Sequence, residues 1–293
     1  VFTANPIEKL VELLRRRGAT LWHACQFQDF VSYLEIGGIP SRELLEQRGQ
    51  EFTPFDTDSR DKENGVWDKV FINLADFGDG FAKDSKCTPN AFGPIALEVA
   101  PGALLDGVTD VAICLRSAGA LGFCRDKAAL GSLKEVELLF YDELSPDLRF
   151  AKDLKEIFPS AAMQPEVSCT IPAGFIPMRY VDEVHVDPYK FGKKSLLFHV
   201  EEQIDEHGYG DHGDQDHLRA TERWAKGGRR RLYKELLDVL LTDVPSLSEL
   251  MTDSSRSPLF LEWCRDIGES GLGWQFRRYA KYLRAGTILP LKD

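Results

Sequence analysis

The sequence predicts an α+β fold in which a part of mixed strands and helices precedes a helical extension. Before Pro188, short segments rich in Val and Ile alternate with turn residues, a pattern typical of half-buried strands. After it, the segments 219–241, 246–252, 258–267 and 274–283 carry apolar residues at helical spacing. At 293 residues the chain is long enough for a packed core with an appendage. We therefore expect one domain over 1–190 and a helical C-terminal extension over 191–293.

The first elements expected are a helix and a strand. The segment 7–18, IEKLVELLRRRG, reads as a short amphipathic helix whose three arginines and final glycine suit a helix C-terminus. A short strand over 20–24 follows and carries His23.

A helix and a glycine turn come next. Phe27, Phe30 and Leu34 recur at helical spacing, and Gly37 and Gly38 supply a stop at which backbone can approach a ligand closely. Ser41 stands where it can cap a second short helix.

Glu166 is the residue of greatest chemical interest, because it stands at the head of an apolar strand that continues through Val167 and Ile171. Pro165 withholds a backbone donor from a sheet, so the strand is expected to begin at Glu166 or to be locally bulged there. A carboxylate that enters a buried sheet is costly unless it is paired or used. Glu166 is therefore expected to be either paired or catalytic, and an acid that reaches solvent at the strand end is the structural alternative.

The order of these features resembles that of the DarT family of nucleic-acid-modifying ADP-ribosyltransferase toxins. The resemblance runs from about Leu21 to Pro188 and rests on the strand with His23, the helix and GG turn, Ser-Arg, the strand VWDKVFINL, then FCRDKAAL and QPEV. It implies an ADP-ribosyltransferase-type split β-sandwich with helical insertions, whose catalytic domain covers 1–190. It also implies that NAD is the co-substrate and lies in the cleft.

The resemblance assigns roles to particular residues. Glu166, His23 and Arg60 are the implied catalytic residues, with His23 holding the NAD ribose and Arg60 the pyrophosphate. A structural histidine and a solvated Arg60, with Arg42 in its place, are the alternatives. The implied cofactor-binding set is His23, Gly38, Ser41, Arg42, Arg60, Phe71 and Asn73.

The segment 125–160 is the expected substrate loop. Its cations Arg125, Lys127, Arg149 and Lys152 are candidate phosphate contacts, and solvated surface charge is the alternative for each.

One carboxylate can suffice for such chemistry. Nicotinamide leaves NAD as a neutral molecule, so no acid is needed for its departure, in contrast to glycoside hydrolysis with its two carboxyl groups. A carboxylate near the anomeric carbon stabilises the developing positive charge. With a raised pKa it can also accept a proton from an incoming base. We expect Glu166 to do both.

Two departures from the family pattern leave the target open. The residues 160–165 before Glu166 carry no basic side chain, and the segment after VFIN reads LADFGDGFAKDS. DNA thymine, DNA guanine and RNA all remain possible targets.

Composition limits the functional classes. The net charge of −11 and pI of about 5.1 do not fit a passive nucleic-acid binder. Six cysteines without CxxC spacing, and no secretory leader, lead us to expect reduced thiols and a cytoplasmic protein. No apolar run reaches the 18 residues of a membrane span. The His- and Asp-rich loop 207–217 lacks a metal motif, and no metal is expected.

The expected function is that of an NAD-dependent mono-ADP-ribosyltransferase that modifies a nucleobase of single-stranded DNA or RNA. A toxin of a toxin–antitoxin or phage-defence system, with an antitoxin protein as partner, is the expected context. An enzyme acting on a protein side chain and an inactive ADP-ribosyltransferase-like interaction module are the alternatives.

Overall fold

The computed structural model describes residues 1–54, 57–76, 93–149, 151–161, 165–186, 190–191, 194–210 and 217–222. The chain divides into two compact units. The first consists of Val1–His23, Ser32–Asp76 and Leu97–Asp182, and the second of Ala24–Val31, Phe77–Ala96 and Glu183–Asp293. The helices expected over 246–252, 258–267 and 274–283 lie outside the described residues, and so does the helix expected over 219–241 except for its first residues, where the structure has strand β12 (Ala220–Glu222) instead. A helical extension with a boundary at 190 otherwise remains a prediction.

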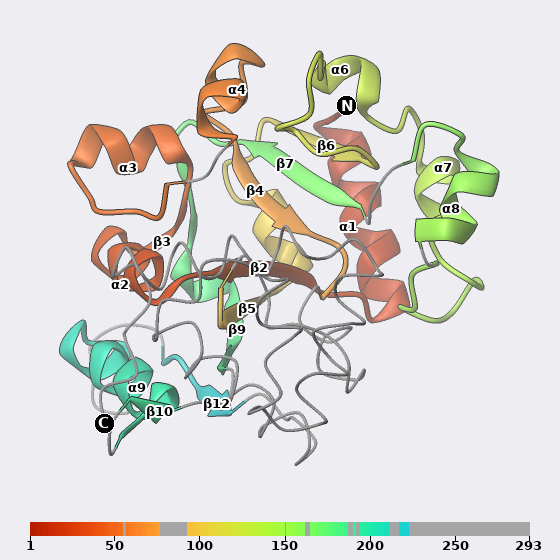
Figure 1. Ribbon diagram of the computed structural model, residues 1–293. Helices are drawn as coiled ribbons and strands as arrows, with labels where there is room; N and C mark the ends of the chain where they lie inside the picture. Colours follow the sequence, from red (N-terminus) through yellow and green to blue (C-terminus); the bar gives the residue numbers. More distant parts are fainter. Residues whose placement is uncertain are drawn as a thin grey trace, which may run out of the picture. The chain divides into compact units, whose positions relative to one another are not determined.

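An eight-stranded sheet runs through the chain in the order β1-β6-β7-β4-β2-β5-β9-β12 (Figure 1). The pairs β1–β6, β6–β7, β4–β7 and β2–β4 are antiparallel, whereas β9 and β12 are parallel. The fold is thus mixed α and β on a largely antiparallel sheet, and the split sandwich remains a prediction. The strands are β1 (Phe2–Thr3), β2 (Leu21–Cys25), β4 (Val70–Asn73), β5 (Ile95–Val99), β6 (Asp110–Cys114), β7 (Glu166–Thr170), β9 (Val181–Val186) and β12 (Ala220–Glu222).

The pleat of the central strands decides which way each functional residue points. Directly opposed residues share a face of a sheet, and successive residues alternate between faces. Val70, Ile72, Val167 and Ile113 fill one face and are almost wholly buried. Glu166 belongs to the other face, which is covered beside β6 by the cluster Val66, Ala112, Cys114, Ala118 and Phe123.

Helix α1 (Asn5–Arg17) matches the expected N-terminal helix, and Gly18 ends it in the left-handed conformation with φ 63°. Its last arginine is buried rather than free. The Arg17 guanidinium lies 4.4 Å from the centre of the Phe140 ring and donates hydrogen bonds to the carbonyls of Asp142 and Ser145. The arginines therefore join the helix to the 137–145 segment, and Arg16 adds an ion pair with Glu137.

The other helices of the first unit are short. They follow β2 and flank the strands that carry the functional residues (Figure 1). Strand β3 (Gly38–Pro40), which lies between α2 and α3 in the chain, pairs antiparallel with β8 (Phe175–Pro177). The helices are α2 (Phe27–Ile36), whose first turn belongs to the second unit, α3 (Arg42–Arg48), α4 (Asp58–Glu63), α6 (Arg125–Ala128), α7 (Leu133–Glu137) and α8 (Ala151–Ile157), with 3-10 turns η1 (Pro101–Leu105) and η2 (Met178–Tyr180).

The described part of the second unit contains both strands and a helix. Helix α9 (Leu196–Glu206) is capped by Ser195, whose hydroxyl accepts a hydrogen bond from the Phe198 N–H at 3.1 Å. Strands β10 (Lys190–Phe191) and β11 (Lys194–Ser195) form a hairpin, and β12 pairs with β9. The residues after 190 are therefore not purely helical, because β12 finds a backbone partner in the sheet.

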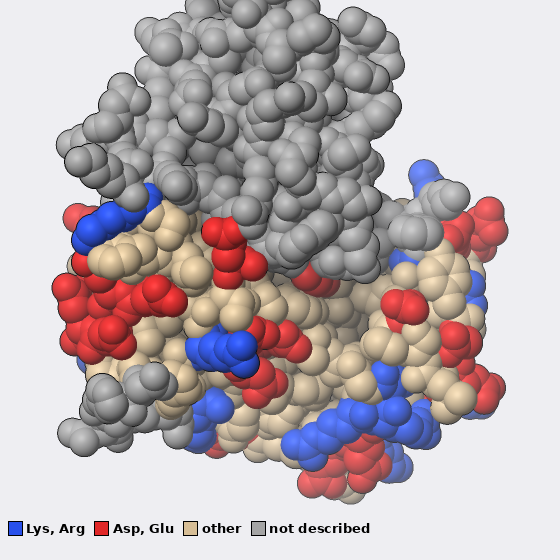
Figure 2. Space-filling view, turned by 90° about the horizontal axis from the view of Figure 1, so that it is seen from below, with Lys and Arg blue, Asp and Glu red and all other residues tan. Residues whose placement is uncertain are grey.

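Charged side chains of both signs are mixed over the described residues of the face shown in Figure 2. Among the described residues, no helix is both long enough and apolar enough to cross a membrane.

Candidate active site

Glu166 is the first residue of β7, as expected from the proline before it. It lies directly opposite Asn73 of β4 on one side and Cys114 of β6 on the other. Its Oε1 atom accepts a hydrogen bond from the Ala118 N–H at 3.1 Å. No lysine or arginine of the described residues forms an ion pair with it. Within the part of the chain that the structure describes, the carboxylate therefore enters the sheet without a cationic partner.

The surroundings of Glu166 raise its pKa to about 7. Burial is the main cause, because it disfavours the charged form. The hydrogen bond from Ala118 works in the opposite direction, and the negative charge of Asp61 adds to the rise. The neighbouring Cys114 thiol has its pKa raised to about 12, by burial and then by the charge of Glu166. The glutamate can thus both hold and release a proton near neutral pH.

The loop 115–123 donates the hydrogen bond to Glu166, and residues at the ends of α4 hold this loop in place. The amide of Asn64, which follows α4, donates hydrogen bonds to the carbonyls of Ala118 at 2.8 Å and Ala120 at 3.3 Å. Gly119 packs so closely on Thr57 that an added Cβ would lie 2.5 Å from its methyl carbon. Side chains at the two ends of α4 therefore set the position of the loop that donates to the glutamate.

Asp61 is a second carboxylate in this region, and no sequence pattern singles it out. It lies on α4, and its buried Oδ1 atom has no hydrogen-bond partner among the described residues. Burial raises its pKa, and the charge of Asp58 adds to the rise, while a hydrogen bond from Thr57 and the charges of Arg42 and Arg60 lower it. The charge of Asp61 thus acts on Glu166, and Asp61 is itself acted on by the charges of Arg42 and Arg60, the two arginines expected to bind NAD.

His23 is held by two hydrogen bonds. Its Nδ1 lies 2.7 Å from the Phe71 carbonyl oxygen, and its Nε2 lies 3.1 Å from the Tyr33 hydroxyl. Because a carbonyl can only accept, Nδ1 carries the proton, and in the neutral ring Nε2 accepts from Tyr33. A ribose hydroxyl could reach Nε2 only by displacing Tyr33.

The strand register does not bring His23 and Glu166 onto one face. Trp22 lies opposite Asn73, and Asn73 lies opposite Glu166, so these three side chains start from the same face of the sheet. His23 is the next residue after Trp22 and starts from the other face. The expectation of a groove with Glu166 on one wall and His23 on the other therefore has no support from the register. Trp22 and Asn73 are the side chains that accompany the glutamate.

Three of the expected cofactor residues have structural contacts. Gly38 is needed because a Cβ there would clash with the Ile176 carbonyl of β8, so the close approach is to the protein's own strand. Ser41 caps α3, its hydroxyl accepting from the Leu44 N–H at 3.2 Å. Arg42 stacks on Phe52, with 4.9 Å between its guanidinium carbon and the ring centre.

Two of the four expected phosphate contacts are engaged within the protein. Arg125 forms an ion pair with Asp110 at 2.5 Å and donates to the hydroxyl and carbonyl of Ser168 at 2.9 and 2.8 Å. Arg149 donates to the Leu138 carbonyl at 3.1 Å. These contacts hold the half-buried Arg125 against Ser168, whose side chain starts from the same face of β7 as Glu166, and its role as a phosphate contact remains a prediction.

The other two cations differ from these. Lys127 is exposed. Lys152 belongs to α8, and its side chain lies outside the described residues.

Comparison with known proteins adds little to this geometry. The sequence matches no family model and no curated protein. Among solved structures, a chain described as "Thermus sp. 2.9 DarT in complex with ADP-ribosylated ssDNA" is similar, with 11% identity and a TM-score of 0.40. The match covers 71% of this chain and 96% of that one. At this identity and TM-score the likeness supports no inference about function.

Proposed function

We propose that this chain is an NAD-dependent mono-ADP-ribosyltransferase that modifies a nucleobase of single-stranded DNA or RNA. The observation that supports it most is the state of Glu166, a half-buried carboxylate with no cationic partner among the described residues and with a pKa of about 7. A structural acid would be expected to find a cation or to reach solvent. The order of sequence features that resembles the DarT family supports the choice of NAD and of a nucleic-acid acceptor.

The proposed reaction breaks the bond between the ribose C1′ of NAD and the nicotinamide nitrogen, and the bonding electrons leave with neutral nicotinamide. The ribose then carries the positive charge of an oxocarbenium ion. Ionised Glu166 stabilises that charge across a short distance in a site of low polarity. A nitrogen or oxygen of the base bonds to C1′, and its proton passes to the Glu166 carboxylate and on to solvent.

The remaining assignments are part of the same proposal. Asn73 shares the face of Glu166, and we assign it to the ribose hydroxyls. Arg60 and Arg42 lie close enough to Asp61 to affect its pKa, and we assign them to the NAD pyrophosphate. Phe71 and His23 act together, because the Phe71 carbonyl fixes the imidazole. A toxin role with an antitoxin partner rests on the resemblance alone.

An inactive ADP-ribosyltransferase-like interaction module is the second candidate. The strand register favours it, because His23 and Glu166 start from opposite faces of the sheet. Binding of NAD separates the candidates, since an inactive module built on this fold would bind none.

Transfer of label from radioactive NAD to single-stranded DNA, RNA and protein, run side by side, tests the proposal. We expect labelled nucleic acid with wild-type protein and none with Glu166→Gln. Glu156→Gln, which removes an exposed carboxylate from α8, is the matched control and should keep the activity. Label on protein would replace the nucleobase by an amino-acid acceptor. Full activity of Glu166→Gln would end the proposal.

A further inference from the structure

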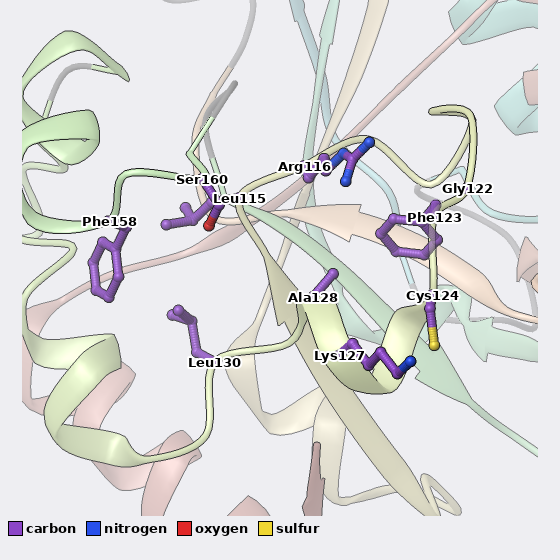
Figure 3. Close-up of a pocket in the computed structure, with 10 residues that line it drawn as sticks. All are labelled: Leu115, Arg116, Gly122, Phe123, Cys124, Lys127, Ala128, Leu130, Phe158 and Ser160. Atoms are coloured by element: carbon purple, nitrogen blue, oxygen red, sulfur yellow. The ribbon is translucent and has the colours of Figure 1, made fainter.

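A cavity of about 270 Å³ opens beside the loop 115–123 (Figure 3). Its lining mixes polar and apolar atoms about equally, and Figure 3 shows Leu115 and Leu130 extending toward Phe158, with Phe123 and Cys124 on the other side of Ala128. Arg116 and Lys127 also line the cavity and are exposed. A lining of this mixed kind with two cations suits a ligand that combines a flat ring with a negative charge.

The cavity adjoins the proposed catalytic residue through the chain itself. Leu115 and Arg116 directly follow Cys114, which is the cross-strand partner of Glu166. Along an extended chain these residues lie within roughly 10 Å of that partner, at about 3.3 Å per residue. The same loop supplies the Ala118 N–H that binds Glu166. A polymer bound at the glutamate can therefore reach the cavity with a neighbouring unit.

The lining matches the two chemical parts of a nucleotide. Bases stack on aromatic rings with little sequence preference, and the half-buried Phe158 provides such a ring, whereas Phe123 belongs to the buried cluster beside β6. Guanidinium and ammonium groups bind phosphate oxygens. Arg116 donates one N–H to the Leu121 carbonyl at 3.2 Å, and a guanidinium has five such donors.

We propose that this cavity is a subsite for one nucleotide of a single-stranded nucleic acid, adjacent to the nucleotide that reacts at Glu166. The base occupies the cavity against the ring of Phe158, and the phosphate binds Arg116 and Lys127. Adjacency to a reacting nucleotide rests on the proposed function, whereas binding of a nucleotide in the cavity does not.

Cys124 gives a direct readout, because its thiol lines the cavity and is exposed, whereas Cys25, Cys114 and Cys169 are buried. Alkylation of the wild-type protein by iodoacetamide is followed by peptide mass spectrometry, which separates Cys124 from every other cysteine. The probes are a mixed-sequence single-stranded oligonucleotide, nucleoside 5′-monophosphates, inorganic phosphate and an acidic peptide, all without NAD. A saturating oligonucleotide should slow modification of Cys124 about tenfold, as expected when one stacked nucleotide covers the thiol.

Each other outcome overturns the proposal. Equal protection by monophosphates would make the cavity a free-nucleotide site, and protection by the acidic peptide would make it a protein-binding site. No protection by any probe would leave the cavity without a nucleic-acid role. If the oligonucleotide is ADP-ribosylated but does not protect Cys124, the subsite fails while the proposed function stands.

Substitutions in the lining give a second test. Lys127→Gln should weaken oligonucleotide binding about tenfold and lower the slope of log K against log salt by about 0.7, the loss of one phosphate contact. Lys134→Gln, which removes an exposed charge from α7, is the matched control and should change neither quantity. Phe158→Leu keeps an apolar side chain but removes the stacking face, and its thermal unfolding shows whether the fold survives. Equal binding by Lys127→Gln and Lys134→Gln would contradict the assignment of the phosphate.

Discussion

At pH 7 the carboxyl group of Glu166 is divided about equally between its protonated and ionised forms, because burial raises its pKa to about 7. Only the ionised form can stabilise an oxocarbenium ion or accept a proton. A group of this kind makes the rate depend on pH in the physiological range, where an exposed glutamate would be fully ionised.

Activity should therefore rise with pH, and the midpoint of this limb of the pH–rate profile should lie near pH 7. We expect the turnover of NAD to increase about tenfold between pH 6 and pH 8 and then to level off. The measurement is initial rate against pH at saturating NAD. A flat profile over this range would show that Glu166 is already ionised in the working enzyme or that another step limits the rate.

The same pKa predicts a stability change for Glu166→Gln. The folded protein holds the Glu166 proton up to about pH 7, whereas the unfolded chain releases it near the ordinary value of 4.5. The part of the wild-type free energy of unfolding that depends on this proton is thus lost as the pH rises from 4.5 to 7. Glutamine never ionises, so the variant should be more stable at pH 8, by about 2 to 3 kcal/mol, and nearly equal to wild type at pH 4.

Denaturant unfolding at both pH values measures this difference. A variant that is less stable at pH 8 would mean that ionised Glu166 has a stabilising partner.

At the scale of elements, α4 and the loop 115–123 act as one support for Glu166. Asn64 bonds to the carbonyls on either side of Gly119, and Ala118 passes this constraint on through its N–H. The Ala118 hydrogen bond lowers the pKa of Glu166 against the effect of burial. A looser loop would weaken that bond, and the effect of burial would then raise the pKa of Glu166 further.

Asn64→Ala should therefore shift the limb of the pH–rate profile to higher pH. We also expect the rate at pH 7 to fall by about tenfold to a hundredfold, as for other small displacements of reacting groups. Asn5→Ala, which removes an exposed asparagine from α1, serves as the control. If Asn64→Ala is less stable but keeps the wild-type limb, Asn64 supports the fold without positioning the glutamate.

Local elements could be predicted from the sequence where one residue type dictates the backbone. Pro165 marks the start of β7, Gly18 ends α1, and Ser41 caps α3. The contacts that support the site could not be predicted this way. Asn64 and Ala118 are 54 residues apart, and only the folded chain shows that they meet. The face on which His23 lies likewise depends on a strand register that no local pattern sets.

At the scale of the whole molecule, charge opposes the proposed substrate. The net charge is −11, and two of the arginines in that count, Arg17 and Arg125, are directed into protein contacts. Figure 2 shows both signs mixed over the described surface of one face. Long-range attraction of a polyanion is therefore not expected, and short-range contacts have to supply the binding.

The association rate with a single-stranded oligonucleotide should consequently rise with salt. Screening shortens to about 8 Å at 0.15 M ionic strength and weakens the repulsion between two negatively charged molecules. Stopped-flow fluorescence at increasing NaCl measures the rate. A rate that falls with salt would indicate that a local basic region, rather than the net charge, guides the encounter.

The internal contacts of Arg125 limit what its motif indicates about function. FCRDKAAL contributed to the resemblance with the DarT family, yet its arginine ties α6 to Asp110 and Ser168. A chain that had lost the enzyme activity could still keep that arginine for these contacts. A genome search for this octapeptide would thus find active and inactive proteins alike, and the residue at position 166 would be needed to tell them apart.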